Sequence, residues 1–376
     1  MTDVRETLSA MALARIGYYH LASIMQMYRK VGSAAAIIEH SREIRDILPE
    51  ATPKLVDVLR DSAAIMTRAE EELRYDQANG IRPIVISDPD YPKRLAECDD
   101  APLVIYYKGN ADLNTTRVVN IVGTRRCTVY GQDLIRRFIT DLATLCPNVL
   151  VVSGLAYGVD ICAHRQSLAS HLPTVGVLAH GLDDLYPPRH LSTAREMVTN
   201  GGLLTEFMTR TNADKINFVR RNRIVAGMSD ACIVIESASH GGALITADIS
   251  RGYGRDVFAF PGRVGDTYSE GCNHLIRDNV AALLTDATDF VKAMGWEGDA
   301  ELAKARKEGI ERQIFTELTA DEEAVVKVLS IHNDLHLNML SVQTGIPVNK
   351  LTGVLFEMEM KGMIRTLAGG MYHLLN

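Results

Sequence analysis

The chain lacks the features that mark secreted, membrane-spanning and zinc-binding proteins. Its six cysteines are scattered and include no Cys-x-x-Cys pair, so the sequence predicts neither a disulfide framework nor a metal site. No apolar run approaches the roughly 20 residues that a membrane-spanning helix needs. The first residues carry charge on both sides of a short apolar stretch, which is unlike a signal peptide. We therefore expect a cytoplasmic protein that binds no metal and contacts no membrane.

The common phosphate-binding and hydrolase motifs are missing too. The chain contains neither the Gly-x-x-x-x-Gly-Lys-Ser/Thr of a P-loop nor the Gly-x-Gly-x-x-Gly of a dinucleotide-binding turn. Ser153 does not stand in the Gly-x-Ser-x-Gly elbow of a hydrolase nucleophile. These absences argue against ATP hydrolysis and hydride transfer, and we expect no cofactor. Ser153, Asp160, His164 and His180 remain as catalytic candidates by residue type.

Length and composition indicate a globular protein of two or three domains. The chain has 376 residues, of which 47% are hydrophobic and 23% are charged, enough to bury a large core. Its net charge of −7 argues against a surface coated in positive charge. A protein with a net negative charge can still contain a basic cleft, so the net charge does not decide whether this protein binds nucleic acid.

Successive changes of pattern along the chain predict its domains. Residues 1–75 carry apolar positions at helical spacing and predict a small helical domain, of SAM or helix-hairpin-helix type. Residues 76–295 alternate strands and helices, which predicts an α/β domain with an extended Rossmann-like, doubly wound and mostly parallel sheet. Residues 296–320 are charged and polar, typical of a linker, and residues 321–376 form a last compact domain.

The last domain has the pattern of a winged helix: three helices followed by a hairpin. The predicted helices span Glu322–Ile331, Leu337–Thr344 and Val348–Lys361. The third helix, which would enter a DNA groove, is poor in arginine and carries Glu357 and Glu359, which would repel phosphates. We therefore favour a protein-contact or structural role for this domain over DNA binding.

Two buried strands run straight into glycine-bearing turns, a layout that favours anion binding. The first turn holds Gly123, Thr124, Arg125 and Arg126, and the second holds Ser153, Gly154 and Ala156. We expect Thr124 to Arg126 to lie at a helix start, where backbone N–H groups and the helix dipole attract an anion. A third turn, at Gly241 and Gly242, closes a later strand. Because parallel strands end at one edge of a sheet, these turns predict one pocket for an anionic ligand.

Other residues of this domain have more than one interpretation. Arg221 and Arg223 lie in a cluster of arginines that fits either a phosphate site or a solvated helix face. Asp160 and His164 stand four residues apart, and we expect them to hold and brace the second turn rather than to relay a proton. The long glycine-rich loop from 260 to 278, with Asn273, is a candidate for folding over the pocket.

The order and spacing of these motifs resemble the DNA-processing protein A family, also called Smf, of bacterial competence. The similar segments are GTRR at 123–126, SGLAYGVDICAH at 153–164, GLDDLYP at 181–187, NRIVAGMSD at 222–230, GGALITA at 241–247, FPG at 260–262 and GCNHLI at 271–276. The resemblance implies a protein that binds single-stranded DNA, forms a homodimer through its Rossmann-like core, and loads the RecA recombinase onto strands displaced from single-strand binding protein. It implies no catalytic step.

The resemblance also implies which residues hold the DNA. Arg125 is the leading phosphate ligand in this interpretation. The expected DNA or phosphate site comprises Gly123, Thr124, Arg125, Arg126, Ser153, Gly154, Ala156, Arg221, Arg223, Gly241, Gly242 and Asn273, with Asp160 and His164 as structural supports. Tyr130, Tyr157, Tyr186 and Phe218 are candidate platforms for bases, although a place in the core is more usual for such residues.

Some positions depart from the family pattern. The third turn reads HGGALIT without the serine common in the family, so an anion there would depend on backbone N–H groups. His180 stands where a glycine-rich turn is usual, and either adds a donor or fills space. The alternative function is a nucleoside-monophosphate phosphoribohydrolase. Its Pro-Gly-Gly-x-Gly-Thr-x-x-Glu turn is absent, and SHGGALITAD offers only Asp248 near the position of the glutamate.

Overall fold

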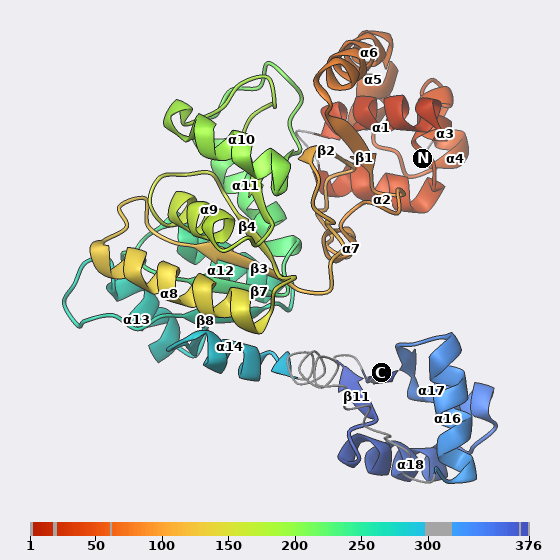
Figure 1. Cartoon of the computed structure of the whole chain (residues 1–376). Helices are drawn as coiled ribbons and strands as arrows, with labels where there is room; N and C mark the ends of the chain where they lie inside the picture. Colours follow the sequence, from red (N-terminus) through yellow and green to blue (C-terminus); the bar gives the residue numbers. More distant parts are fainter. Residues whose placement is uncertain (1–2, 18–20, 61, 298–317, 368–369, 375–376) are drawn as a thin grey trace. The chain divides into compact units, whose positions relative to one another are not determined.

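The computed structural model describes residues 3–17, 21–60, 62–297, 318–367 and 370–374 (Figure 1). The chain divides into two compact units, Met1–Glu301 and Leu302–Asn376. The predicted linker at 296–320 lies largely outside the described residues.

The first unit opens with helices that pack around an apolar core. They are α1 (Val4–Gly17), α2 (Leu21–Val31), α3 (Ala34–Glu39), α4 (Ile44–Ile47), α5 (Pro53–Arg60) and α6 (Ser62–Asn79). Met11, Leu13 and Ile37 are fully buried in this core. The same apolar cluster continues to Tyr106 in the sheet and to Met208, so the helices are joined to the α/β part by shared packing.

A nine-stranded sheet forms the centre of this unit. Its strands are β1 (Arg82–Val85), β2 (Val104–Gly109), β3 (Val118–Val122), β4 (Leu150–Ser153), β5 (Thr174–Val177), β6 (Gly201–Thr205), β7 (Ala231–Val234), β8 (Asp256–Ala259) and β9 (Ala282–Leu283), in the order β1-β2-β6-β5-β4-β3-β7-β8-β9. From β6 to β9 all neighbours are parallel. The predicted Rossmann-like, mostly parallel sheet is confirmed.

The strand order reverses beside β3. After β3 the chain moves outward through β4, β5 and β6, and then returns to place β7 on the other side of β3. Val119 of β3 thus pairs with Val151 of β4 on one side and with Ala231 of β7 on the other. Open α/β sheets bind ligands beyond the carboxyl ends of the strands at such a reversal.

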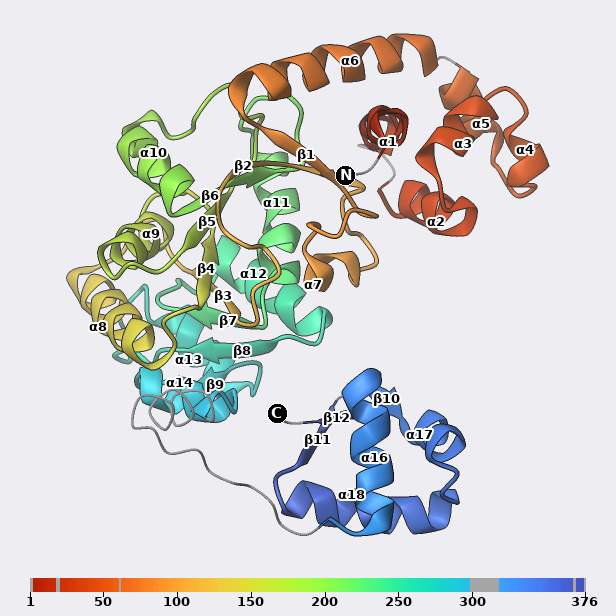
Figure 2. The ribbon, with the colours of Figure 1, turned by 45° about the vertical axis from the view of Figure 1, so that its right-hand side comes forward.

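Helices cover both faces of the sheet (Figure 2). The helices of the α/β part are α7 (Lys93–Ala96), α8 (Val129–Leu145), α9 (Val159–Ala169), α10 (Leu191–Thr199), α11 (Lys215–Gly227), α12 (Gly242–Gly252), α13 (Glu270–Arg277) and α14 (Ala287–Ala293), with a 3-10 turn at Pro188–His190. Val118 and Val122 of β3 face the cluster that α11 and α12 complete, whereas Val119 and Ile121 face α8, α9 and α14. This burial on both faces explains why β3 is apolar almost throughout.

One edge of the sheet runs antiparallel, which the sequence did not predict. β2 pairs antiparallel with β6 and with β1. The Tyr107 hydroxyl donates to the Gly201 carbonyl at 2.7 Å, and a Cβ at Gly202 would lie 2.4 Å from the Tyr107 ring. Because Gly201 and Gly202 of β6 have no side chains, the Tyr107 side chain of β2 has room to lie across β6.

The second unit is a winged helix, as predicted. It comprises α16 (Ala320–Ile331), β10 (Leu335–His336), α17 (Leu337–Thr344), α18 (Val348–Met360), β11 (Ile364–Leu367) and β12 (Met371–Leu374). Thr319 and Glu322 form a capping box at the start of α16, and Gly345 ends α17 with a φ of 71°. Leu340 and Leu355 are buried where the helices meet.

A buried histidine fixes the turn between β4 and α9. His164 lies on α9, and its Nε2 is 2.8 Å from the Gly154 carbonyl, while Nδ1 is 2.7 Å from the Thr174 hydroxyl. Because a carbonyl only accepts, Nε2 carries the proton, and the Thr174 hydroxyl lies between Nδ1 and the Val151 carbonyl, which is 2.9 Å from it. Burial lowers the pKa of His164 from 6.5 to about 4, helped by the positive charge of Arg221, so the neutral ring is the folded form.

This titration predicts acid sensitivity of the first unit. Since the folded pKa lies below the unfolded one, the unfolded chain binds the extra proton as the pH falls from 6.5 toward 4, and stability is lost in that window. Between pH 7.5 and 5 this amounts to about 2 kcal/mol of unfolding free energy. We expect His164→Gln, which cannot titrate, to show a correspondingly smaller loss in urea denaturation at the two pH values.

The exposed His274→Gln variant is the control for losing one imidazole from the chain. A pH dependence of stability in His164→Gln equal to that of the wild type would contradict the assignment.

Candidate functional site

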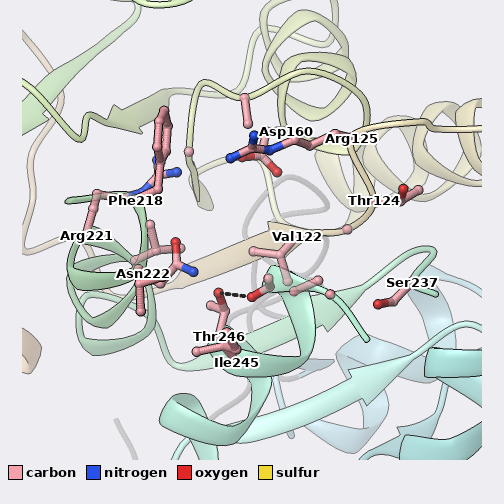
Figure 3. Close-up of a pocket in the computed structure, with 18 of the residues that line it drawn as sticks. Val122, Thr124, Arg125, Asp160, Phe218, Arg221, Asn222, Ser237, Ile245 and Thr246 are labelled. Carbon is pink, nitrogen blue, oxygen red and sulfur yellow. Dashed lines mark hydrogen bonds between the residues drawn. The ribbon is translucent and has the colours of Figure 1, made fainter. Parts of the chain in front are cut away.

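A pocket of about 680 Å³ lies where the strand order reverses (Figure 3). Four segments line it: the loop after β3, the turn after β4, one face of α11 and the start of α12. The predicted residues that line it are Gly123, Thr124, Arg125, Gly154, Ala156, Asp160, Arg221, Gly241 and Gly242. The three glycine turns of the sequence therefore meet at one pocket.

The loop after β3 is held by its backbone rather than by a helix. A Cβ at Gly123 would lie 2.4 Å from Val159 Cγ2, so only glycine fits. Thr124 N–H donates to the Glu236 carbonyl at 2.7 Å, and Val159 N–H donates to the Thr124 carbonyl at 3.1 Å. The prediction that a helix begins at Thr124 to Arg126 is wrong, because α8 begins at Val129.

The start of α8 is already occupied by a carboxylate of the chain. Glu236 accepts hydrogen bonds from the Thr128 N–H at 2.8 Å and from the Thr128 hydroxyl at 2.5 Å. A Cβ at Gly131 would lie 2.2 Å from Glu236 Oε2, so glycine makes room for the carboxylate. A carboxylate of the chain thus occupies the positive end of this helix.

A second internal carboxylate lies at the start of α9. Asp160 is buried and accepts from the Ala156 backbone N–H. Burial raises its pKa, while the nearby Arg221 guanidinium opposes the rise. A Cβ at Gly154 would lie 2.3 Å from Asp160 Oδ2 and 2.4 Å from Arg221 Nη1. Glycine at 154 therefore lets a buried acid and a buried base approach the turn together.

Arg221 is a structural cation at the floor of the pocket. Its side chain is only 4% exposed, and it donates to the Val177 carbonyl at the end of β5. Burial lowers its pKa, and Asp160 opposes that effect. Its Nε has no hydrogen-bond acceptor within the described chain, so a donor remains unsatisfied in the folded protein.

Phe218 links two arginines across the pocket (Figure 3). The Arg125 guanidinium carbon lies 5.0 Å from the ring centroid, and that of Arg221 lies 6.0 Å from it. Arg125 is exposed and forms no ion pair within the described residues. Stacking on an aromatic face orients an arginine while leaving its N–H edge available. Arg125 is thus a positioned and exposed cation, whose charge also opposes the rise of the Asp160 pKa that burial causes.

The start of α12 is the open helix end of the pocket. Gly241 caps the helix without a side-chain hydrogen bond, and the first-turn residues Gly241 and Gly242 are exposed. A Cβ at Gly242 would meet nothing within 4 Å. The α9 cap, Gly158, also lacks a side-chain hydrogen bond, but α9 carries Asp160 in its first turn, whereas the first turn of α12 has no acidic residue.

Several predicted residues do not line this pocket. The Ser153 hydroxyl is fully buried and donates to the Ile121 carbonyl at 2.6 Å. Arg126 is exposed, and its N–H bonds the Thr124 hydroxyl at 3.1 Å. Asn273 pairs with both backbone groups of Gly262, at 3.1 and 3.0 Å. Ser153, Arg126 and Asn273 therefore form hydrogen bonds elsewhere in the chain, and none of them lines the pocket.

Arg223 faces away from the pocket although it follows Arg221 by two residues. It is 6% exposed and forms an ion pair with the buried Glu206, and it lines a separate hollow together with Asp248. Residues two positions apart on a helix lie on opposite faces, so Arg221 faces the pocket and Arg223 does not.

His180 is also structural: Nδ1 donates to the Gly181 carbonyl at 2.8 Å, and Nε2 accepts from the Tyr186 N–H at 3.1 Å.

Sequence reasoning missed Lys215, Asn222 and Ser237, which all line the pocket. The signal for the first two was present in α11, because positions 215, 218, 222 and 225 have helical spacing and form one face. Ser237 belongs to the irregular segment between β7 and α12, where no periodicity indicates which way a side chain points.

The described residues contain no group of histidine, cysteine, aspartate and glutamate side chains that could hold a metal ion. Within the same residues, no helix combines the length and the apolar character needed to cross a bilayer.

Comparison with known proteins shows which family the chain resembles. Residues 82–295 match the family model of DNA recombination-mediator protein A, and residues 312–370 match that of the DprA winged helix domain. DNA processing protein DprA of Streptococcus pneumoniae is 37% identical over 206 residues, which cover 55% of this chain and 72% of that one.

Solved structures agree with this match. The X-ray structure of DNA processing protein A from Streptococcus pneumoniae aligns with a TM-score of 0.57 and 31% identity, covering 72% of this chain and 97% of that one. DNA processing protein A from Helicobacter pylori, described by its single-stranded DNA binding mode, aligns with a TM-score of 0.52 and 27% identity, covering 57% and 95%. With a family model over more than half of its length, the chain belongs to the DNA-processing protein A family, DprA or Smf.

Proposed function

We propose that the protein binds single-stranded DNA in the pocket at the strand reversal, without cleaving it. The observation that carries the proposal is the pairing of Arg125, exposed and without an ion pair among the described residues, with the open start of α12 across one pocket. Arginine binds two phosphate oxygens with its planar guanidinium group, and backbone N–H groups at a helix start donate hydrogen bonds to an anion. A phosphate between them would meet donors from both sides.

The pocket suits a single strand better than a duplex. Phe218 and Ile245 give its wall an apolar surface, and Ile245 is 43% exposed. Bases of a single strand are free to leave the stack and rest on such a surface, at about 1–3 kcal/mol per stacked base, whereas a duplex keeps its bases stacked. The Helicobacter pylori relative, described by its single-stranded DNA binding mode, supports the same ligand.

Hydrolysis of nucleoside monophosphates fits the pocket poorly. Asp248, the residue nearest to the position of the hydrolase glutamate, lines a separate hollow with Arg223. Asp160 is buried against Arg221 and the Ala156 N–H. We therefore propose a binding protein rather than an enzyme.

The wider role follows from the family resemblance. We propose that the protein acts in the cytoplasm in natural transformation and recombination, protects incoming strands, and loads RecA in place of single-strand binding protein. We also propose that it acts as a homodimer, so that two pockets engage one strand.

Removing the proposed phosphate ligand tests the site. Arg125→Ala should weaken binding to an oligo-dT by about 10-fold or more, because a charge-assisted hydrogen bond worth about 1.5–3 kcal/mol is lost. Arg126→Ala is the matched control: it removes the same charge from the neighbouring, exposed position outside the pocket. We expect a change of about twofold for it, as for a surface charge.

Fluorescence anisotropy of a labelled oligonucleotide measures both variants. Equal affinities of Arg125→Ala and the wild type would reject the site. Release of free base from a nucleoside monophosphate by the same preparation, absent in Arg125→Ala, would favour the hydrolase instead.

The salt dependence of binding gives a separate prediction. If about four phosphates are contacted, log K should fall with log salt with a slope near −3, at about 0.7 per phosphate of a single strand. Arg125→Ala should make the slope shallower by about 0.7, because one phosphate contact disappears. Anisotropy titrations over a series of salt concentrations measure the slope, and an affinity independent of salt would contradict phosphate binding.

RecA loading predicts a kinetic effect. On an oligonucleotide coated with single-strand binding protein, RecA starts to hydrolyse ATP after a lag. We expect the protein to shorten that lag and Arg125→Ala to leave it long, because the variant cannot hold the strand. A lag that the wild-type protein does not change would count against loading, whatever its affinity for DNA.

A further inference from the structure

Two cysteines lie together beside the DNA pocket. Cys127 follows the loop that carries Arg125 and directly precedes Thr128, the cap of α8. Cys162 lies on α9. Both are half-buried, whereas Cys98, Cys146, Cys232 and Cys272 are buried. The side chains of Cys127 and Cys162 pack against the same apolar cluster, where they interact with each other.

Backbone packing fixes the two segments against each other. A Cβ at Gly158 would lie 2.2 Å from the Thr124 carbonyl oxygen and 2.8 Å from Arg125 Cα, so the loop rests directly on the start of α9. The Val159 N–H donates to the Thr124 carbonyl at 3.1 Å. Cys162 follows one turn later, its N–H bonded to the Gly158 carbonyl at 3.2 Å. The packed backbone of residues 124–125 and 158–159 thus brings the segments of Cys127 and Cys162 together.

The two thiols differ in reactivity. The hydrogen bond from Cys127, with the positive charge of Arg165, lowers the pKa of Cys162 to about 7 against the opposing effect of burial. The pKa of Cys127 is raised by the same interaction, by burial and by the charge of Glu236. Cys127 Sγ and the Glu236 carboxylate both lie against Gly131, whereas Arg165 follows Cys162 one turn later on α9. Because the thiolate is the nucleophile and a positive neighbour favours it, we assign Cys162 as the attacking group and Cys127 as the resolving one.

We propose that Cys127 and Cys162 are a modification site at which a low-molecular-weight disulfide, such as oxidised glutathione, converts the two thiols into an intrachain disulfide. The Cys162 thiolate attacks one sulfur of the oxidant, forms a mixed disulfide and releases one glutathione thiolate. Cys127 then loses its proton and attacks Cys162 Sγ, which releases the second glutathione. Two protein thiols are oxidised, one small disulfide is reduced, and both protons end on glutathione.

The disulfide changes the DNA pocket, a consequence that rests on the proposed function. Bonded sulfurs lie about 2.05 Å apart, much closer than two interacting thiols. Closing that distance draws Cys127 toward α9, and Arg125 stands only two residues before it. The arginine then loses its place on the Phe218 ring, and single-stranded DNA binds more weakly.

Peptide mapping of the full-length protein tests the bond without any DNA. After treatment with oxidised glutathione, we expect trypsin to release the peptide of Cys127 linked to the peptide of Cys162. No Lys or Arg lies between Arg137 and Arg165, so the second peptide also contains Cys146. The variant C146S should therefore keep the linkage and C162S should lose it. In C127S, Cys162 should instead accumulate as a mixed disulfide with glutathione.

Anisotropy with labelled oligo-dT tests the consequence. Oxidation should weaken binding by about 10-fold, the loss expected for Arg125→Ala, and dithiothreitol should restore it. Binding by C127S/C162S should not respond to the oxidant. A mapping result without the Cys127–Cys162 link overturns the site, and a formed link with unchanged DNA binding overturns the control of the pocket. If the reduced protein binds no DNA, the proposed function fails, while the mapping result still decides the disulfide.

Discussion

The buried pair of Asp160 and Arg221 is the interaction on which the pocket depends. A charge taken out of water is costly unless another charge and hydrogen bonds compensate for it. Here the guanidinium also donates to the Val177 carbonyl, and the carboxylate accepts from the Ala156 N–H. Both groups reach the turn after β4 because Gly154 has no Cβ to block them. The attraction between Asp160 and Arg221 thus offsets part of the cost of burying each, and Arg125 at the rim is the exposed cation that the proposed function assigns to a ligand.

The same use of internal carboxylates selects which helix end receives a ligand. A helix start attracts any anion, and the chain supplies its own at two of the three turns: Glu236 at α8 and Asp160 at α9. The start of α12 has two glycines and no capping side chain. Under the proposed function, a phosphate would therefore bind at one place, opposite Arg125, rather than at any of three similar turns.

Sequence patterns predicted the elements well and the side-chain environments less well. Alternating apolar strands and helices gave the doubly wound sheet, and the winged-helix elements agree almost residue for residue, because local periodicity determines both. The antiparallel edge strand β2 depends on Tyr107 fitting the glycines of β6, a contact between residues far apart in the sequence. The sequence analysis grouped Arg223 with Arg221, yet Arg223 pairs with Glu206, which lies 17 residues earlier in the sequence. A sequence motif does not show that a side chain is buried against a partner elsewhere in the chain.

One pocket cannot by itself account for tight binding of a long strand. Arg125 offers one positioned fork, and a charge-assisted hydrogen bond contributes only about 1.5–3 kcal/mol. A stacked base on the apolar wall adds about 1–3 kcal/mol. Such sums correspond to about millimolar binding, near −4 kcal/mol. A second pocket on a partner subunit makes the next contact intramolecular, at an effective concentration that the intervening nucleotides set. The proposed homodimer would supply that second pocket, and affinity that rises with strand length is its expected signature.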